Sequence, residues 1–364
     1  MSVEVTDGML DAMLEDLRRL VETESPSDDR EALTRSAEVL AQILTERLGP
    51  GVELIDGPAG PHVRWRGSNE PKVLVLGHHD TVFPMGTLER RPFEVEAGRA
   101  TGPGVFDMKA GIVQAIWGVA ASGRAESAEL LFSCDEEVGS ITSRALIEER
   151  AVACGSVLVL EPSADGGALK VGRKGTGTFQ VVIHGRASHA GLEPEKGTNS
   201  LIEAAHQVLA IAALGDADRG TTVTPTVARA GTADNVVPAE TTIRVDVRVT
   251  GPEEAARIEA AMASLTPVNP DASIEVSGSV GRPPMPQGSA GYLLDIARSH
   301  DEEIGAVVVG GGSDGNFTAA LGVPTLDGMG AVGGGAHADH EHVLVSTMPE
   351  RARLVAAVVA GCCA

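Results

Sequence analysis

Acidic and histidine side chains follow three short apolar runs of this chain, and this arrangement is typical of a metal site. Each run has the length of a buried strand, and the polar residues come directly after it: His78 and Asp80, then Asp135–Glu137, and then Glu161. In open α/β sheets, ligands bind beyond the carboxyl ends of the strands, so these side chains are expected to meet in one crevice. Borderline divalent metals such as zinc take this mixture of imidazole and carboxylate ligands. The pattern therefore predicts a metal centre.

Two further residues extend this set of candidate ligands. Asp107 lies in the glycine-containing segment 102–109, where the backbone can come close to metal ions and a carboxylate can bridge two of them. His337 follows three glycines and an alanine, a loop flexible enough to bring a distant histidine back to the centre. Glu341, four residues further on, is expected to be a solvated loop acid. Two metals about 3.5–4 Å apart can polarise a carbonyl and lower the pKa of a shared water, so hydrolysis is the predicted chemistry.

Within each pair of neighbouring residues in this set, one can be a metal ligand while the other has a different role. Glu136 and Glu137 are adjacent, so one can ligate a metal while the other acts as the general base that takes the proton of the water. His78 and Asp80 lie two residues apart, so one can ligate while the other orients it. The residues alone leave open which member of each pair has which role. His79 is not expected to be a ligand, because adjacent side chains at a strand end point apart.

The elements that must position these residues alternate between helix and strand. Helices are expected at about 7–22 and 33–48, after Asp107, and near 141–151. Strands are expected near residues 52–56, 62–66, 73–77, 129–134 and 156–160. This alternation predicts an α/β catalytic domain with a doubly wound, mostly parallel sheet.

The pattern changes after Gly172, where strands with period-2 alternation begin. From residue 178 to residue 277 the expected order is strand, helix, two strands, helix and strand, which is the ferredoxin-like α+β unit. The α/β pattern resumes after the proline-rich segment 283–286. We therefore predict a catalytic domain made of residues 1–173 and 286–364, interrupted by an inserted domain of residues 174–285.

Composition limits the classes of function. The chain has 364 residues, which favours two domains. Its net charge of −22 disfavours nucleic acid and anionic membrane surfaces as partners, and no apolar run is long enough for a transmembrane helix. The first residues lack the features of a signal peptide, and the four cysteines show neither disulfide nor metal spacing. Reduced thiols in a cytoplasmic protein are therefore expected.

The candidate ligands lie in motifs that resemble those of the dizinc glutamate carboxypeptidases. That family also contains aminoacylases, acetylornithine deacetylases and succinyl-diaminopimelate desuccinylases. The resemblance covers essentially the whole chain in order, and it is carried by the segments 77–86, 104–109, 135–140, 160–162, 188–191 and 335–337. It implies two Zn²⁺ ions per chain, with Co²⁺ or Mn²⁺ as substitutes.

The resemblance also implies a role for each residue of the centre. The implied metal ligands are His78 and Glu161 on one ion, Glu137 and His337 on the other, and Asp107 between them. Glu136 is then the general base, and Asp80 orients His78. In such enzymes the peptide bond after Asp107 is often cis, and the same is expected here.

In these relatives the inserted domain mediates dimerisation, which implies a homodimer. His189, in the segment 188–191, is then expected to reach the partner subunit's site and to stabilise the tetrahedral oxyanion. Asn235 and Arg248 match positions that contact the substrate carboxylate or the oxyanion, and arginine suits this task because its planar fork pairs bidentately with a carboxylate. Ser313 lies in a loop that is expected to line the substrate pocket.

Two other interpretations compete with a metal centre. Ser313 lies in a G-x-S-x-G motif, and Asp327 and His337 follow it in the order of an α/β-hydrolase triad. About fifty residues after the serine are few for the rest of that fold, and the upstream acids would have no role. A scaffold that kept the fold and lost the chemistry would lack a ligand or a base, and none is missing.

The sequence therefore predicts a metal-dependent hydrolase that cleaves an amide bond next to a free carboxylate. The segments 81–86 and 322–328 favour the glutamate carboxypeptidase branch, which releases a C-terminal amino acid. The alternative is an N-acyl-amino-acid deacylase, of the acetylornithine deacetylase or desuccinylase type, that uses the same site. The expected substrate is a small peptide or an N-acyl amino acid.

Overall fold

The chain forms two compact units. The computed structural model describes residues 7–362. One unit contains the described residues up to Gly172, Gln287–Val309, and the described residues from Ser313 onward, and the other contains Arg173–Pro286 and Gly310–Gly312. The second unit thus begins and ends one residue outside the predicted inserted domain, and it includes a glycine segment that the sequence pattern does not assign to it.

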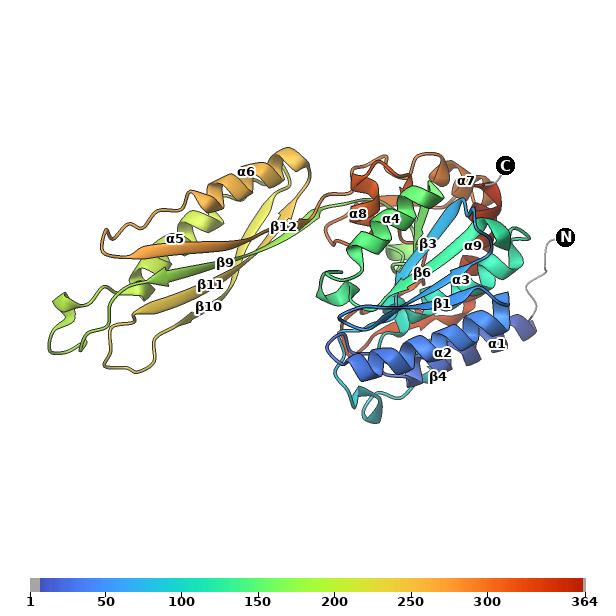
Figure 1. Cartoon of the computed structure of the whole chain (residues 1–364), viewed down its shortest axis with the longest axis horizontal. Helices are drawn as coiled ribbons and strands as arrows, with labels where there is room; N and C mark the ends of the chain where they lie inside the picture. Colours follow the sequence, from blue (N-terminus) through green and yellow to red (C-terminus); the bar gives the residue numbers. More distant parts are fainter. Residues whose placement is uncertain (1–6, 363–364) are drawn as a thin grey trace. The chain divides into compact units, whose positions relative to one another are not determined.

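The first unit is built on a six-stranded sheet (Figure 1). In spatial order its strands are β1 (Val52–Asp56), β2 (Pro61–Arg66), β6 (Ala128–Ser133), β3 (Val73–His78), β7 (Val157–Val159) and β14 (Thr325–Leu326). Strand β3 pairs in parallel with β6 and β7, and β14 pairs in parallel with β7, whereas β1 and β2 form an antiparallel edge. The predicted α/β fold with a mostly parallel sheet is confirmed.

Helices cover both faces of this sheet, which explains why β3 is buried at every position. Val73 and Val75 belong to one core and Leu74 and Leu76 to the other, since successive side chains of a strand point to opposite faces. The first core is shared by α1 (Asp7–Glu22), α2 (Arg30–Leu48), α3 (Ala110–Ala121), α7 (Tyr292–His300) and α9 (Met348–Gly361). The second core is covered by α4 (Arg144–Cys154), beside the short helix α8 (Gly315–Ala320). None of the helices in the described part of the chain is both long and apolar enough to cross a membrane.

Two small sheets complete the first unit. Strands β15 (Gly333–Gly334), β16 (His342–Leu344), β5 (Arg99–Thr101) and β4 (Glu94–Glu96) form a four-stranded sheet in that order. It joins the loop of His337, which connects β15 to β16, to the segment that follows Thr101. Strands β8 (Leu169–Arg173) and β13 (Ala306–Val309) form a separate pair.

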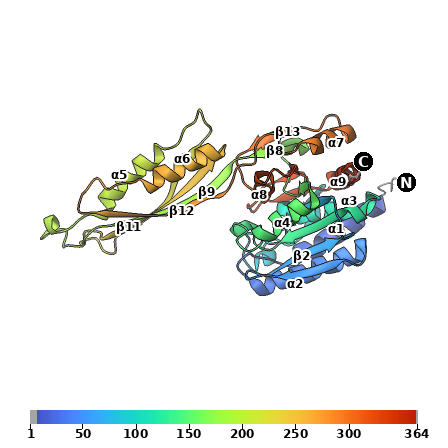
Figure 2. The ribbon, with the colours of Figure 1, turned by 45° about the horizontal axis from the view of Figure 1, so that its top comes forward.

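The second unit has the ferredoxin-like arrangement that the order of elements predicts. Its chain order is β9 (Gly175–His184), α5 (Ser200–Ala212), β10 (Thr222–Ala230), β11 (Glu240–Val249), α6 (Pro252–Ala263) and β12 (Ser273–Arg282). The four strands pair antiparallel in the order β10-β11-β9-β12. Both helices lie along the same face of this sheet (Figure 2), and their apolar side chains form a separate core with the alternate strand residues.

Candidate active site

The parallel strands β6, β3 and β7 are neighbours in the sheet, so their carboxyl ends deliver the acids and histidines to one place. His78 is the last residue of β3, and Glu161 lies two residues beyond β7. Glu136 and Glu137 form a short 3₁₀ helix just beyond β6. Nitrogen and oxygen atoms of His78, Glu136 and Glu161 lie within 4.8 Å of one another, as do those of His78, Asp107 and Glu137. The sheet therefore brings together the residues that the sequence pattern predicts to meet.

His78 presents a different ring nitrogen to each of its two groups of neighbours. Its Nε2 lies 3.3 Å from Oδ1 of Asp107 and 3.9 Å from Oε1 of Glu161. Its Nδ1 lies 3.0 Å from the backbone oxygen of Asp80 and 3.3 Å from the Oδ1 atom of that residue. Contact with a carbonyl oxygen favours a proton on Nδ1 and leaves Nε2 as the nitrogen that can ligate a metal.

Asp107 lies between the two histidines, with one carboxylate oxygen toward each. Its Oδ1 faces His78, and its Oδ2 lies 3.3 Å from Nε2 of His337. The same nitrogen of His337 lies 3.1 Å from Oε2 of Glu137. The peptide bond between Asp107 and Met108 is cis. The five predicted ligands thus form two groups, His78 with Glu161 and His337 with Glu137, on either side of one carboxylate.

The two histidines and the carboxylate between them perturb one another's ionisation. Hydrogen bonds with Asp107 and Glu137 raise the pKa of His337 to about 10. Burial alone would lower the pKa of His78, but its contacts with Asp107 and Asp80 outweigh burial and hold that pKa well above its usual value. Burial also opposes ionisation of Asp107, and the hydrogen bonds from the two histidines outweigh it, so its pKa lies below the usual value. The acids therefore attract cations strongly.

The donor set fits a pair of divalent metal ions. Oε1 of Glu137 is buried and makes no hydrogen bond to any residue in the described range, and the contact of the buried Oδ1 of Asp107 with Nε2 of His78 is long, at 3.3 Å. A buried carboxylate oxygen without a donor is costly unless a cation completes it. The set offers two imidazole nitrogens and several carboxylate oxygens, which is the mixture that zinc and related ions accept.

Asp80 connects two of the segments that carry candidate ligands. It is fully buried, and its side chain contacts Nδ1 of His78. Its Oδ1 and Oδ2 also accept the backbone N–H groups of Glu136 and Glu137, both at 3.2 Å, and Oδ2 accepts the hydroxyl of Ser27 at 2.7 Å. Burial alone would raise the pKa of Asp80. The contacts with His78 and Ser27 lower it by more, so the pKa lies below its usual value and the carboxylate stays ionised. The carboxylate therefore links the histidine at the end of β3 to the turn that holds the two glutamates.

His79 points away from this group, as the alternation of side chains along a strand predicts. Its Nδ1 lies 3.1 Å from the hydroxyl of Ser36 and its Nε2 lies 3.1 Å from the backbone oxygen of Pro61. Burial lowers its pKa to about 4, so it is neutral at physiological pH. Both ring nitrogens are used, which leaves His79 as a structural residue.

Glu341 is the residue of this region that sequence reasoning placed wrongly. It is not a solvated loop acid: its side chain is fully buried. Its carboxylate accepts three backbone N–H groups, from Gly104, Phe106 and Asp107. Burial raises its pKa to about 7, because the loss of solvation exceeds what the three N–H donors return. No sequence signal marks such a residue, since its partners are backbone atoms more than two hundred positions away.

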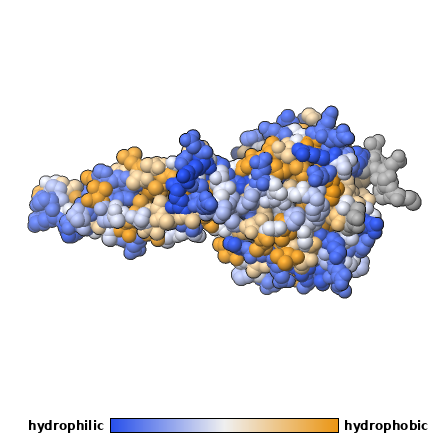
Figure 3. Space-filling model, turned by 90° about the horizontal axis from the view of Figure 1, so that it is seen from above, coloured by the Kyte–Doolittle hydropathy of each residue, from blue (hydrophilic) through white to orange (hydrophobic). Residues whose placement is uncertain are grey.

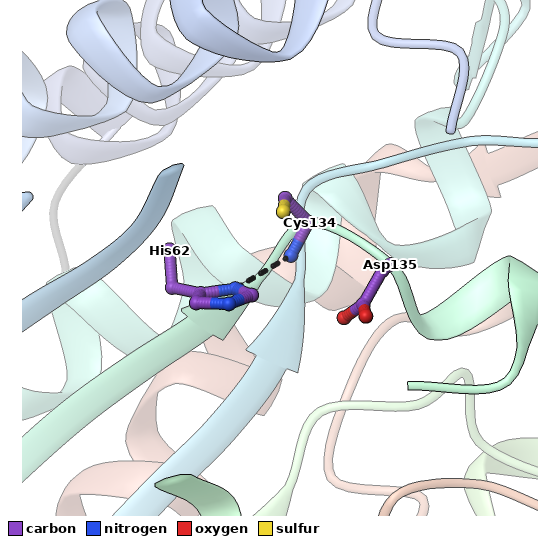
Figure 4. A group of neighbouring side chains, drawn as sticks. All are labelled: His62, Cys134 and Asp135. Atoms are coloured by element: carbon purple, nitrogen blue, oxygen red, sulfur yellow. Dashed lines mark hydrogen bonds between the residues drawn. The ribbon is translucent and has the colours of Figure 1, made fainter. Parts of the chain in front are cut away.

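A second group of potential ligands, His62, Cys134 and Asp135, lies at the end of β6 (Figure 4). The backbone N–H of Cys134 donates to Nδ1 of His62 at 3.3 Å. Oδ2 of Asp135 accepts the amide and the hydroxyl of Thr142. Burial raises the pKa of the Cys134 thiol to about 12, so it is protonated. These contacts describe a hydrogen-bonded core cluster rather than a metal centre.

The predicted oxyanion and substrate residues of the second unit lie in two separate places. His189 and Asn235 are neighbours, because residue 189 bridges to Val236 and the N–H of Ala190 donates to the backbone oxygen of Asn235. His189 is exposed, and its Nδ1 accepts N–H groups of its own turn. Arg248 is near the far end of β11, where its guanidinium forms a two-point ion pair with Asp246 at 2.9 and 3.0 Å.

Ser313 is fully buried in the first unit. Its hydroxyl donates to Oδ2 of Asp327 at 2.6 Å and accepts the N–H of Gly315 at 3.1 Å. A serine nucleophile needs a histidine within hydrogen-bond reach of its hydroxyl. That hydroxyl is instead committed to a carboxylate and a backbone amide. His337, the histidine that the alternative triad requires, lies with Asp107 and Glu137.

Comparison with known proteins agrees with this geometry. Residues 74–361 match the model of peptidase family M20/M25/M40. Carboxypeptidase G2 from Pseudomonas sp. (strain RS-16) is 33% identical over 376 residues, which cover 96% of this chain and 88% of that protein. Succinyl-diaminopimelate desuccinylase from Xanthomonas oryzae pv. oryzae is 31% identical, over 78% of this chain and 81% of that enzyme.

A solved structure repeats the fold of the whole chain. The aminopeptidase PepT from Bacillus cereus superposes with a TM-score of 0.76 at 21% sequence identity, and the match covers 98% of this chain and 99% of that one. At that identity the likeness supports the fold, and the family assignment depends on the matches in sequence. The chain therefore belongs to peptidase family M20/M25/M40, whose members are metal-dependent hydrolases of amide bonds.

Proposed function

We propose that this chain uses two metal ions to hydrolyse the amide bond next to a free carboxylate, as a carboxypeptidase that releases a C-terminal amino acid. The observation that carries the proposal is the position of Asp107, whose two carboxylate oxygens lie 3.3 Å from two different histidines. In this proposal His78 and Glu161 hold one ion, and Glu137 and His337 hold the other. Zinc is the proposed metal, with Co²⁺ or Mn²⁺ as substitutes, because the set mixes imidazole and carboxylate ligands.

Glu136 is the proposed general base. Bound metal ions would polarise the scissile carbonyl and acidify a water held between them. Glu136 adjoins one candidate ligand, Glu137, and it belongs to the same group of donor atoms as His78 and Glu161. It would take the proton of the attacking water and later deliver it to the leaving amine. Asp80 would support this step by holding the backbone N–H groups of both glutamates.

The proposed substrate has a C-terminal amino acid, and glutamate is the first one to test. Support comes from Carboxypeptidase G2, which is similar over nearly the whole chain, and from the segments 81–86 and 322–328. A second candidate function is N-acyl-amino-acid deacylation, which the similarity to succinyl-diaminopimelate desuccinylase favours. Both reactions use the same centre and differ in the acyl group that the pocket accepts. Ser313 stays a proposed pocket residue, through its backbone, because its hydroxyl bonds to Asp327.

A homodimer is proposed because one chain separates two groups of predicted substrate contacts. Arg248 pairs with Thr176 on β9, whereas His189 lies beyond His184 at the other end of that strand. Eight residues of extended strand span about 26 Å, which exceeds the length of a small N-acyl amino acid. His189 and Arg248 of one chain therefore cannot contact the same small substrate, but residues of two chains can. His189 and Asn235 would then serve the partner's centre.

The surface of the second unit supports self-association. Helix α5 exposes Leu201, Ile202 and Leu209 by 49, 60 and 72%. This helix packs beside β10, which is an edge strand of the sheet. Apolar residues also gather in patches on the surface of this unit that Figure 3 shows. Apolar side chains next to an edge strand are a surface that a second copy can cover.

We also propose that the protein works in the cytoplasm. Cys134 and Cys154 form no disulfide, which agrees with a reducing compartment. The net charge of −22 disfavours nucleic acid as a partner. Fractionation of the cells that produce the protein would test the location.

The proposal is tested by the metal content of the purified protein together with hydrolysis before and after chelation. About two zinc ions per chain, and release of glutamate that stops on chelation and returns with metal, are the expected results. N-acyl-glutamate and a panel of other N-acyl amino acids would rank the two candidate functions. Activity that survives complete removal of metal would contradict the metal centre, and cleavage of N-succinyl or N-acetyl substrates alone would favour deacylation.

A further inference from the structure

His337 and Glu341 lie on one short loop but in opposite surroundings. The side chain of His337 is 51% exposed, whereas that of Glu341 is fully buried. Glu341 directly precedes β16, which pairs with β5, and β5 ends at Thr101 just before the segment that carries Asp107. The loop of the exposed histidine and the segment of the central carboxylate therefore start from the same small sheet.

Both carboxylate oxygens of Glu341 are bound by the backbone of that segment. Oε1 accepts the N–H groups of Phe106 and Asp107, both at 2.9 Å, and Oε2 accepts the N–H of Gly104 at 3.1 Å. Gly104 has a φ of 71°, a left-handed conformation that glycine adopts without strain. Consecutive backbone N–H groups that converge on an anion in this way form a nest, and hydrogen bonds to an ionised carboxylate are stronger than neutral ones.

We infer that Glu341 is a positioning residue of the metal centre, which fixes the backbone of Asp107 relative to His337 and thereby sets the affinity for metal. This inference rests on the ligands proposed above. Asp107 can serve two ions only if each of its oxygens keeps its own direction, toward His78 or toward His337. A small rotation of the residue would misdirect both oxygens at once.

The loop that carries His337 needs a contact that fixes it relative to Asp107, and Glu341 makes that contact. His337 has a φ of 62°, which side-chain-bearing residues rarely adopt, and it lies on the loop between β15 and β16, beyond the paired residues Gly333 and Gly334. Glu341 ties the end of this loop to the segment of Asp107, so the two ligands that meet at 3.3 Å are held together by a contact that touches no metal. Groups that orient ligands in this way typically change metal affinity 10–100-fold when they are removed.

Glu341→Gln is the variant that tests this inference. Glutamine has nearly the same shape and keeps one oxygen, but it places an NH₂ group against a backbone donor and removes the charge. We expect the dissociation constant for Zn²⁺, measured by competition with a chromophoric chelator, to rise about 10–100-fold. The absorption bands of the Co²⁺-substituted protein should also change, because they report the ligand geometry rather than the stability of the fold.

Glu203→Gln in the second unit is the matched control. Glu203 is also buried, and its oxygens accept two backbone N–H groups, from Val268 and Asn269, at 2.9 Å. The control therefore removes the same kind of charged contact at a place that holds no candidate ligand. We expect it to lower the melting temperature while the Zn²⁺ affinity stays within about twofold and the Co²⁺ spectrum keeps its wild-type shape.

The outcomes separate this inference from the proposed function. If the wild-type chain binds no metal, the metal centre fails and this inference fails with it. If the wild-type chain binds metal and Glu341→Gln binds it as tightly as Glu203→Gln does, the metal centre stands and only the role of Glu341 is overturned. If Glu341→Gln does not fold, Glu341→Asp keeps the charge but is one methylene too short for all three bonds. Wild-type affinity in that variant would also overturn the inference.

Discussion

The two halves of the proposed metal centre are built in different ways. His78 and Glu161 follow buried parallel strands, so the sheet alone determines their positions, and the His78 side chain is 1% exposed. The other half is formed by Glu137, from a turn, and His337, which is 51% exposed on a glycine-rich loop. Asp107 contacts both halves. The difference teaches that folding of the core positions one pair of proposed ligands, whereas the position of the other pair depends on hydrogen bonds between loops.

This contrast separates the tasks of the two halves. The contrast in exposure comes from the two histidines, because the Glu161 and Glu137 side chains are 11% and 6% exposed, so an ion held by His78 would be the more enclosed of the two. The exposed half can admit the substrate and respond to its binding, as loop-borne sites on a rigid scaffold usually do. Asp80 and Glu341 are buried acids that bind backbone N–H groups beside the proposed centre: Asp80 binds those of Glu136 and Glu137, and Glu341 binds that of Asp107.

Removal of one histidine from each half is the strongest test of the comparison. His78→Ala is expected to lose nearly all metal and all measurable activity, because His78 is the one imidazole of its half and its loss also removes the contact between its Nδ1 and Asp80. His337→Ala is expected to keep about one metal ion per chain, since the strand-end half remains. Metal analysis after gel filtration measures both. Equal losses in the two variants would show that the halves do not bind metal separately.

Glu136→Gln has the next largest effect and tests the chemistry that both halves serve. We expect kcat to fall by about 10²–10⁴-fold while the metal content stays at the wild-type value, because a base is lost and no proposed ligand is changed. Glu137→Gln is the matched control: the neighbouring residue on the same turn, whose loss should reduce metal content. Normal turnover in Glu136→Gln would remove it from the mechanism.

His189→Ala tests whether a third region, from the partner chain, completes the centre. We expect kcat to fall by up to about 10²–10³-fold, the usual cost of one oxyanion donor, with little change in KM or in metal content. A heterodimer of His189→Ala with Glu136→Gln should regain part of the activity, because one of its two centres then combines an intact base with an intact histidine. An unchanged kcat in His189→Ala homodimers would exclude this contribution.

The positions of His78 and Glu161 at strand ends were predictable from the sequence. The contact by which Glu341 holds the segment of Asp107 was not. His78 and Glu161 follow apolar runs of strand length, and the end of a parallel strand is where a ligand is expected. Glu341 was placed in solvent because its partners are backbone N–H groups, which any sequence supplies. The small sheet that contains β16 and β5 was not predicted either, because a strand of two or three residues is too short to show an alternation of apolar and polar side chains.

The pH dependence of metal affinity gives a further test of the contrast between the His78 half and the His337 half. In the metal-free chain, hydrogen bonds with Asp107 and Glu137 raise the pKa of His337 from 6.5 to about 10, so this imidazole is protonated at neutral pH. A raised pKa stabilises the metal-free fold fully below the unfolded value of 6.5, and this contribution is lost as the pH rises through about 10. Metal affinity must change in the opposite direction, because a bound ion displaces the proton of His337.

We therefore expect metal affinity to rise with pH between about 7 and 9, by about tenfold per pH unit for each proton displaced. The pKa of His78 is raised too, so the wild-type slope contains the protons of both halves. The His337→Ala variant isolates the exposed half, since its slope should be smaller than the wild-type slope by about one proton. Chelator competition at several pH values measures both slopes. Identical slopes would mean that His337 gives up no proton to the metal, and the exposed histidine would then not be a ligand.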